Sequence, residues 1–523
     1  MILLMNMLTP LKADDETHQL RPQTDRALVF QGGGALGAYE AGMYKALYAR
    51  LNETALKEKR QLFDIVSGTS AGAINASIIV SHFLQNKDKF NPWDGSAEKL
   101  EEFWNDVSTD TLLYESPFLH GFIDASSFLR DRFNDFWVNA FESDEYSHNF
   151  RNNPYFQSFH YLWPDRLGKL ASKESFRRYF SWLQFSYLPL GIHNVFSPLI
   201  YQPDFHFMNP FNHILKYNND ALTKTIKKYW DYEELPIKSA EGQPRLLLIA
   251  VDVQDATTIT FDSYPKKGGQ MLSIYGNEDI KQKHQVRYDK GIGIEHLLTT
   301  MSSHVRLNFP TLNAITGEVE NDQIIEGIMS PRPFMDGFYL SNTPLREVQS
   351  HRDYWYKVKE IEDHVPSLDI YIGDLYPQIE EGTPRDPDAI NNRVQNVLFH
   401  DKTKYDEKVT TMISDYVNII NELINMVRTK DKNITKDSIY SQLEQQLRDR
   451  LVSNKRDGGP RDIKNLLKGR FTINQVQRVV YGDGQKIDDS DDIFGKAFDF
   501  STKTINYLIA QGINDTIAKF GLK

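Results

Sequence analysis

Two glycine-rich turns carry the residues of this chain that are best suited to chemistry. The first is the triple glycine at 32–34, and the second is the segment Gly-Thr-Ser-Ala-Gly at 68–72. Each follows a short apolar run and precedes a run typical of a helix, so each predicts a strand-turn-helix corner. One corner presents the hydroxyl of Ser70 and the other presents backbone N–H groups. A nucleophile and an anion cradle are the minimum that acyl transfer requires.

Ser70 fits the G-x-S-x-G pattern of a nucleophile elbow. In that motif a strained turn exposes the serine, and glycines two positions to either side, here Gly68 and Gly72, relieve crowding. The N-terminus of the following helix favours negative charge that develops near the hydroxyl. The same string also fits a plain strand-to-helix turn with an incidental serine, because such strings arise by chance.

The triple glycine admits three interpretations. Gly32, Gly34 and Gly37 also satisfy G-x-G-x-x-G, but a dinucleotide site needs a second strand ending in an acidic residue about 20 positions further on. Glu53 has that spacing but lies in a polar stretch. An oxyanion hole uses the same physics, because backbone N–H groups at a helix start stabilise an anion. A tight helix-sheet corner is the structural alternative.

A serine nucleophile needs a base, and Asp336 is the candidate. An aspartate can serve directly when it hydrogen-bonds the hydroxyl and the oxyanion is well stabilised. By spacing alone, Asp336 is one of 71 acidic residues. A Ser-His-Asp hydrolase is the rival, and it requires a histidine late in the chain. We expect packing or surface roles for the histidines at 296, 304, 351, 364 and 400.

The apolar runs predict an α/β fold. Expected strands lie at 26–31, 62–67, 245–253, 257–263 and 368–374, and expected helices at 37–49 and 71–84. Strand, glycine turn and helix in repetition indicate a parallel sheet with helices on its faces. Residues 86–240 are rich in aromatic side chains and predict an inserted, mostly helical or irregular segment. Beyond residue 380 the pattern is helical, with Asp386 capping a helix that begins at Pro387.

Composition narrows the class of protein. The formal net charge is −11, which argues against nucleic acid as a partner because phosphate binding needs a basic face. The chain has no cysteine, so it has neither a thiolate nucleophile nor a Cys-ligated zinc site, and it is compatible with the cytoplasm. No uncharged apolar run reaches 18 residues, so we expect no membrane-spanning helix. The acidic run at 488–492 predicts a solvated loop, not a calcium site.

Three segments in order resemble the patatin-like phospholipase family: GGGALGAYEAG (32–42), GTSAG (68–72) and DGFYLSNTPL (336–345). The family signature is a glycine-rich oxyanion loop, a G-x-S-x-G elbow and an Asp-Gly segment followed by Asn-x-Pro. The resemblance covers roughly residues 26–375. The closing segment, residues 498–520, is also similar to the tail of a microbial subgroup of patatin-like proteins.

The resemblance implies a three-layer α/β/α fold with a central, mostly parallel sheet, a large inserted helical segment and a helical C-terminal extension. It makes Ser70 the nucleophile and Asp336 the proton acceptor. It assigns the oxyanion hole and the supporting positions to glycines: Gly32, Gly33 and Gly34 for the hole, and Gly37, Gly68, Gly72 and Gly337 for support.

Two positions depart from the family pattern. Relatives often carry a basic residue where this chain has Leu36, and they mostly have Gly or Ala where it has Phe338. The bulk of Phe338 narrows the expected pocket or tilts Asp336. This supports an alternative in which the protein binds lipid, or acts as a scaffold, with weak or no catalysis. The segment 296–310 also lacks the small residues usual there, which leaves the local pocket shape open.

Together these observations predict a serine acyl hydrolase that acts on lipid acyl esters through an acyl-enzyme, with no cofactor and no metal. We expect a flexible tail at 1–25, a catalytic domain at 26–375 with residues 86–240 as a lid or substrate segment, and a mostly helical region at 380–523. The expected location is cytoplasmic, with transient contact at membrane surfaces. The sequence leaves open which ester is hydrolysed and the oligomeric state.

Overall fold

A ten-stranded sheet forms the centre of the molecule. The computed structural model describes residues 24–109, 197–198, 217–230, 236–276, 282–302, 309–320, 323–359, 361, 365–379, 387–430, 438–449, 451–454, 459–462, 473–482 and 496–521. The strand order is β14-β11-β1-β2-β5-β10-β9-β8-β7, and β6 pairs with β5. The strands are β1 (Thr24–Phe30), β2 (Ile65–Thr69), β5 (Arg245–Asp252), β6 (Thr257–Asp262), β7 (Leu272–Tyr275), β8 (Gln282–Arg287), β9 (Thr311–Glu318), β10 (Gly327–Asp336), β11 (Ser367–Asp374) and β14 (Ile473–Val480).

The sheet has a parallel part and an antiparallel part. From β14 through β11, β1 and β2 to β5, every neighbouring pair is parallel. From β5 through β10, β9 and β8 to β7, and between β5 and β6, the pairs are antiparallel. The parallel strands are apolar along their whole length, as expected of strands covered on both faces. The expected mostly parallel centre is confirmed for this part of the sheet.

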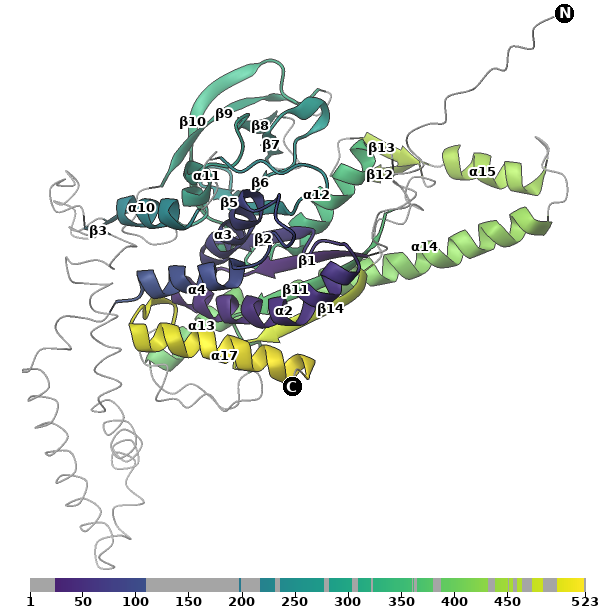
Figure 1. Ribbon diagram of the computed structural model, residues 1–523. Coiled ribbons are helices and arrows are strands. Elements are labelled where there is room, and N and C mark those ends of the chain that lie inside the picture. The colour runs from purple at the N-terminus through teal and green to yellow at the C-terminus, as the bar shows by residue number, and fades with distance from the viewer. Residues whose placement is uncertain are drawn as a thin grey trace, which may run out of the picture.

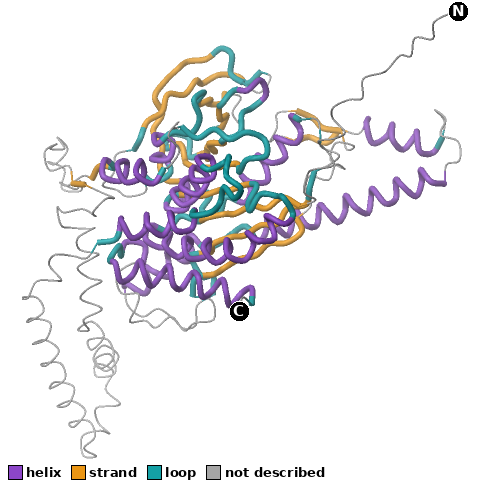
Figure 2. Tube along the Cα trace, in the orientation of Figure 1, coloured by secondary structure: helices purple, strands orange, loops and turns teal. Residues whose placement is uncertain are grey.

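Helices cover both faces of the parallel part. Leu28 and Phe30 of β1 belong to one buried cluster, whereas their neighbours Ala27 and Val29 belong to another. This alternation follows from the two-residue period of a strand. The first cluster is completed by four helices and the second by a fifth. These are α2 (Gly37–Lys57), α3 (Ala71–Gln85), α4 (Ser96–Val107) and α17 (Thr502–Phe520) on one face, and α12 (Leu345–Val358) on the other. Figure 2 shows the helices around the strands of this α/β/α arrangement.

Other helices and two small sheets complete the described structure. The helices are α10 (Asp220–Tyr229), α11 (Ile294–Thr299), α13 (Pro387–Phe399), α14 (Lys404–Lys430) and α15 (Ile439–Asp449). The small sheets pair β3 (Ser197–Pro198) with β4 (Tyr217–Asn218), and β12 (Leu451–Asn454) with β13 (Gly459–Asp462). Within the described residues, no helix is both long and apolar enough to cross a membrane.

Several element bounds differ from the sequence-based expectations. β1 begins at Thr24, because Thr24 already pairs with Ser367 of β11, so the expected tail at 1–25 overlaps this strand by two residues. β2 runs from Ile65 to Thr69, later than the expected 62–67, because its ladder with β1 begins at Ile65. The tail before residue 24, most of the aromatic segment at 86–240 and the acidic run at 488–492 lie outside the described residues.

The C-terminal region contributes to the core of the fold. It is mostly helical, as expected, but β14 also extends the central sheet beside β11. α17 lies along α2 in Figure 1, and both helices place a glycine at the contact. A Cβ atom on Gly42 would lie 2.0 Å from the carbonyl oxygen of Ile509, and one on Gly512 would lie 2.0 Å from that of Tyr39. The hydroxyl of Tyr39 also donates to Asp515 at 2.9 Å.

The substitution Gly512→Ala tests this close helix contact. Alanine favours a helix over glycine by about 1 kcal/mol, but here its methyl group would force α17 away from α2. We therefore expect the free energy of unfolding to fall by about 1–3 kcal/mol, the usual cost of overpacking. Urea denaturation followed by circular dichroism measures it. Asn514→Ala, at an exposed position of the same helix, is the control, and an increase in stability in both variants would contradict the contact.

Candidate active site

The turn between β2 and α3 holds Ser70 in a strained conformation. Ser70 has φ 55° and ψ −124°, a region that side chains other than glycine rarely adopt and that costs about 1–3 kcal/mol. The flanking glycines permit the turn. A Cβ atom on Gly68 would lie 2.1 Å from the carbonyl oxygen of Gly72, and one on Gly72 would lie 2.6 Å from that of Gln31. The serine therefore stands at the N-terminus of α3 on a turn that requires both glycines.

The glycine loop at 32–34 connects β1 to α2 and passes close to Ser70. A Cβ atom on Gly32 would lie 2.8 Å from the Cβ of Ser70. Gly34 has φ +56°, and a Cβ there would lie 2.3 Å from the carbonyl oxygen of Ala497. Gly37, at the start of α2, faces Trp104, whose Cζ2 would be 2.5 Å from an added Cβ. The loop is thus packed between the serine turn and the C-terminal segment.

The three loop glycines do not have the same role. The N–H of Gly32 donates to Oδ1 of Asn342 at 2.9 Å, so this donor already holds the loop in place. Gly33 and Gly34 line the cavity described below. The oxyanion assignment of Gly32 that the family resemblance implies therefore needs correction: in this structure its N–H group is used by Asn342.

Asp336 is the last residue of β10 and is fully buried. Its Oδ1 accepts a hydrogen bond from the backbone N–H of Phe338 at 3.0 Å, which fixes the carboxylate relative to the following turn. Gly337 allows that turn to approach β5, because a Cβ atom there would lie 2.4 Å from the carbonyl oxygen of Ile249. The backbone of Phe338 thus orients the carboxylate, whereas its ring stacks on Phe399 with 4.4 Å between ring centroids.

One cavity of about 310 Å³ brings the predicted site residues together. Ser70, Asp336, Gly33 and Gly34 all line it. Most of the other lining residues are apolar or aromatic: Ala71, Ile74, Phe103, Trp104, Val107, Leu222, Met301, Phe338, Tyr339, Tyr376, Gln395, Phe399, Ala497, Phe498 and Phe500. No histidine is among these residues. A hydroxyl, a carboxylate and backbone amides therefore share one apolar chamber.

Two tyrosines of the cavity respond to the carboxylate of Asp336. Burial raises the pKa of Tyr339, and the negative charge of Asp336 raises it further. The pKa of Tyr376 is raised in the same way, by burial and then by the charges of Asp336 and Glu40. Both phenols therefore stay protonated at neutral pH.

A buried network under the site was not expected from the sequence. Glu40 is fully buried and accepts hydrogen bonds from the N–H of Gln31 at 2.6 Å and from Nδ2 of Asn75 at 3.1 Å. The side chain of Gln31 donates to Thr343 at 2.7 Å and accepts from the N–H of Leu375 at 2.8 Å. The network joins the glycine loop, α3 and the segment after Asp336. Its one sequence signal is a glutamate within the small and apolar residues that open α2.

The described histidines have structural roles, as the sequence analysis expects. His296 is buried against Phe261, with 5.0 Å between ring centroids, and its Nδ1 accepts from the N–H of Gly293. His351 contacts Asp262 at 2.8 Å. His400 lies near carbonyl groups at the end of α13. The histidines at 304 and 364 lie outside the described residues. Across the described ranges, no group of three or more His, Asp or Glu side chains could hold a metal ion.

Comparison with known proteins decides the family. A profile of the family described as patatin-like phospholipase matches residues 28–348. The chain belongs to the patatin-like phospholipase family. This confirms the family and the α/β/α fold that the sequence predicted, and members of this family act as lipid acyl hydrolases.

A solved structure also resembles the chain. The crystal structure of VipD from Legionella pneumophila shares 10% sequence identity with a TM-score of 0.26, and the match covers 94% of this chain and 67% of that one. A comparison with curated proteins gave no match.

The substitution Glu40→Gln tests the buried network through pH. Burial raises the pKa of Glu40 well above 4.5, and this effect exceeds the opposing hydrogen bonds from Gln31 and Asn75. The folded protein therefore keeps a proton that the unfolded chain releases once the pH exceeds 4.5. As a result, the free energy of unfolding falls as the pH rises from there toward the folded-state pKa.

Glutamine does not titrate, so the stability of the Glu40→Gln variant relative to the wild type should increase with pH. Urea denaturation between about pH 5 and pH 8 measures this difference, because the window spans the range in which the two states hold different numbers of protons. A difference that stays constant over the whole range would contradict a raised pKa.

Proposed function

We propose that this patatin-like protein is a serine acyl hydrolase that cleaves lipid acyl esters through a Ser70–Asp336 dyad. The observation that carries the proposal is the cavity that Ser70, Asp336, Gly33 and Gly34 line together. A nucleophile, a base and oxyanion donors around one chamber are the parts that acyl transfer needs. The family membership supports the same reaction class.

The strand register supports the pairing of the two side chains. Thr69, the residue before Ser70, pairs with Ile249 of β5, and Asp336 pairs with Ala250, the next residue of that strand. Ser70 and Asp336 therefore follow the sheet at the same level on either side of β5. Two strand spacings separate their backbones by about 10 Å, a gap that a serine and an aspartate side chain pointing inward can bridge.

In the first step, Oγ of Ser70 attacks the carbonyl carbon of the ester while its proton passes to the carboxylate of Asp336. The oxyanion that forms accepts hydrogen bonds from the N–H groups of Gly33 and Gly34. The C–O bond to the leaving alcohol then breaks, and the alcohol oxygen takes the proton from Asp336. An acyl-serine remains.

In the second step, water attacks the acyl carbon and gives its proton to Asp336. The ester bond to Ser70 breaks, Oγ regains a proton, and the fatty acid leaves. Because a carboxylate is a weak base, the backbone donors must carry much of the stabilisation. Each such donor is worth about 2.7–4 kcal/mol in other hydrolases.

The walls of the cavity favour an acyl chain as the group that is bound. Phe103, Trp104 and Val107 come from α4, and Leu222 comes from α10. Both helices belong to the aromatic-rich segment at 86–240, so the described parts of that segment supply the apolar wall that the sequence analysis assigned to it. Apolar walls with few polar groups at one point are typical of sites for lipid-like ligands. Contact with a membrane surface and a cytoplasmic location stay predictions from the sequence.

Phe338 keeps a second candidate in view, a lipid-binding protein with weak catalysis. Its ring lies against those of Tyr339 and Phe399, with centroids 4.1 Å and 4.4 Å away, and lines the cavity. This bulk reduces the room beside Asp336. The hydrogen bond from its backbone N–H nevertheless holds the carboxylate, so the ring limits the substrate and leaves the base oriented.

The substitutions Ser70→Ala and Asp336→Asn test the dyad. We expect each to reduce kcat for p-nitrophenyl esters by about 10³-fold or more, because loss of a nucleophile or its base removes the main chemical step. Asp289→Asn, which makes the same change at an exposed position, is the matched control and should keep its rate. Thermal melting shows whether each variant is folded.

A folded Ser70→Ala variant with unchanged esterase activity would refute the assignment. A wild-type protein that binds fatty acids but hydrolyses no ester would favour the lipid-binding alternative.

The substitution Phe338→Gly tests the role of the ring in substrate choice. Removing the ring enlarges the cavity beside Asp336, so we expect kcat/KM for long or branched acyl esters to rise by about tenfold relative to acetyl esters. One to two methylene groups of added burial account for that factor. Phe90→Ala, which removes a ring that is 92% exposed, serves as the control. An unchanged ratio of the two kcat/KM values would exclude a sieving role.

A further inference from the structure

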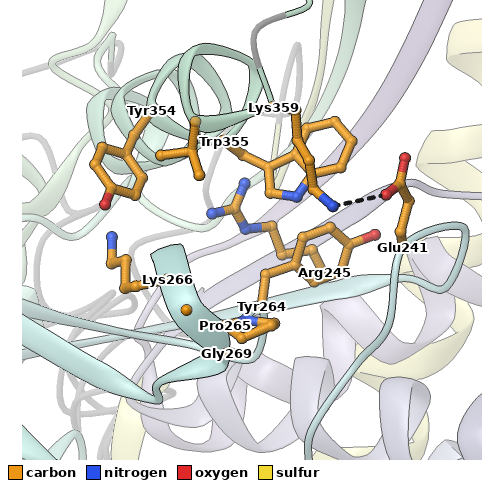
Figure 3. A pocket seen from close by; sticks show the side chains of 11 residues that line it. Glu241, Arg245, Tyr264, Pro265, Lys266, Gly269, Tyr354, Trp355 and Lys359 are labelled. Carbon is orange, nitrogen blue, oxygen red and sulfur yellow. Dashed lines mark ion pairs between the residues drawn. The ribbon is translucent and has the colours of Figure 1, made fainter. Parts of the chain in front are cut away.

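A second cavity, of about 380 Å³, lies between β5 and α12. Cationic and aromatic side chains dominate its lining: Glu241, Arg245, Tyr264, Pro265, Lys266, Gly268, Gly269, Tyr354, Trp355, Val358 and Lys359. Figure 3 shows the guanidinium group of Arg245 in the middle of these side chains, with Lys266 and Tyr354 to one side and Lys359 and Trp355 to the other.

This cavity is separate from the candidate active site. The two cavities share no lining residue. Arg245 begins β5 and pairs with Ile65, the first residue of β2, whereas Ser70 follows the last residue of that strand. Four residues along a strand span about 13 Å, so the second cavity lies at the opposite edge of the parallel sheet.

Arg245 forms a rigid cationic floor. The residue is only 4% exposed, and its Nε donates to Asp262 at 2.8 Å, with Nη2 on the other carboxylate oxygen. His351 contacts the same carboxylate at 2.8 Å. Burial lowers the pKa of His351 to about 4, so it is neutral at pH 7. The floor thus keeps one cation and one carboxylate in fixed positions.

Aromatic rings form the walls, and each carries a cation. The guanidinium of Arg245 lies 5.0 Å from the ring centroid of Tyr264. The ammonium group of Lys266 lies 4.0 Å from the centroid of Tyr354, and that of Lys359 lies 5.8 Å from the centroid of Trp355. Such cation–π contacts hold the positive groups beside the rings and along the cavity.

The charges of the cavity differ in sign from those of the whole chain. Three cations, Arg245, Lys266 and Lys359, face two carboxylates, because Lys359 pairs with Glu241 at 3.0 Å and Arg245 with Asp262. The balance of +1 stands out in a protein whose formal net charge is −11. Walls of low dielectric strengthen the field of such a cluster inside a cleft.

We propose that this cavity binds a small aromatic anion, a flat ring that bears a phosphate or a carboxylate. The rings of Tyr264, Tyr354 and Trp355 offer surfaces on which a flat group packs, and the side chains of Lys266 and Arg245 attract its negative charge. A cationic ligand is disfavoured because cations already occupy the ring faces. The volume lies at the lower end of the roughly 300–1,000 Å³ of small-molecule sites, which suits one mononucleotide-sized molecule.

Titration calorimetry on the full chain tests the proposal with two probes, AMP for the phosphate and salicylate for the carboxylate. Adenosine and inorganic phosphate separate the ring from the charge. We expect at least one probe to bind in a 1:1 ratio. For AMP, we expect adenosine alone and phosphate alone to bind at least about tenfold more weakly, because each keeps one of the two contacts.

Variants locate the binding. Lys266→Gln and Trp355→Leu should each raise Kd by about fivefold to tenfold, the usual loss for one cation–π or ionic contact in a cleft. Lys290→Gln, at an exposed lysine elsewhere, should leave Kd unchanged. Ser70→Ala should also leave Kd unchanged, so this result does not depend on the proposed hydrolase activity. Thermal melting confirms that each variant is folded.

The proposal is overturned if neither AMP nor salicylate binds. It is equally overturned if binding is as tight in folded Lys266→Gln and Trp355→Leu as in the wild type, because the probe would then occupy another site. Binding that is lost in Ser70→Ala would assign the probe to the first cavity and would also contradict the proposal.

Discussion

The structure of the site depends on the close approach of the backbone at Gly32 to Ser70 and Asn342. Any side chain at position 32 would collide with both, since its Cβ would lie 2.8 Å from the Cβ of Ser70 and 3.0 Å from Oδ1 of Asn342. The absence of that atom lets the ends of β1, β2 and β10 converge. The hydrogen bond from Gly32 to Asn342 then ties the glycine loop to the segment that follows Asp336. Without this approach, the hydroxyl and the carboxylate would have no common chamber.

The rest of the molecule supports this convergence from below and from the side. Glu40, Gln31 and Thr343 form a buried chain of hydrogen bonds beneath the loop. The carbonyl of Ala497 packs against Gly34, so the C-terminal segment closes the loop from outside. α12 leaves the site on the opposite face of the sheet and carries Trp355 to the second cavity. The two cavities are therefore built on the two ends of the same sheet.

The sequence predicted the elements of the site well because their signals are local. Glycines around Ser70 and apolar runs before each turn are patterns of a few adjacent residues, and they indicated the family and the α/β/α fold. Contacts between distant segments gave no such signal. The pairing of β14 with β11, the network around Glu40 and the use of the Gly32 N–H by Asn342 all join residues that are far apart in the chain. The second cavity was missed for the same reason, since Arg245, Lys266 and Trp355 meet only in the folded protein.

The most direct test of the central claim is covalent labelling of the full chain with a fluorophosphonate, followed by peptide mass spectrometry. An activated serine attacks such a reagent, whereas an ordinary hydroxyl does not. The account predicts a single phosphonate adduct on Ser70, and its formation should be suppressed when the base at position 336 is changed to asparagine. A folded protein that stays unlabelled, or that carries its adduct on another serine, would contradict the account.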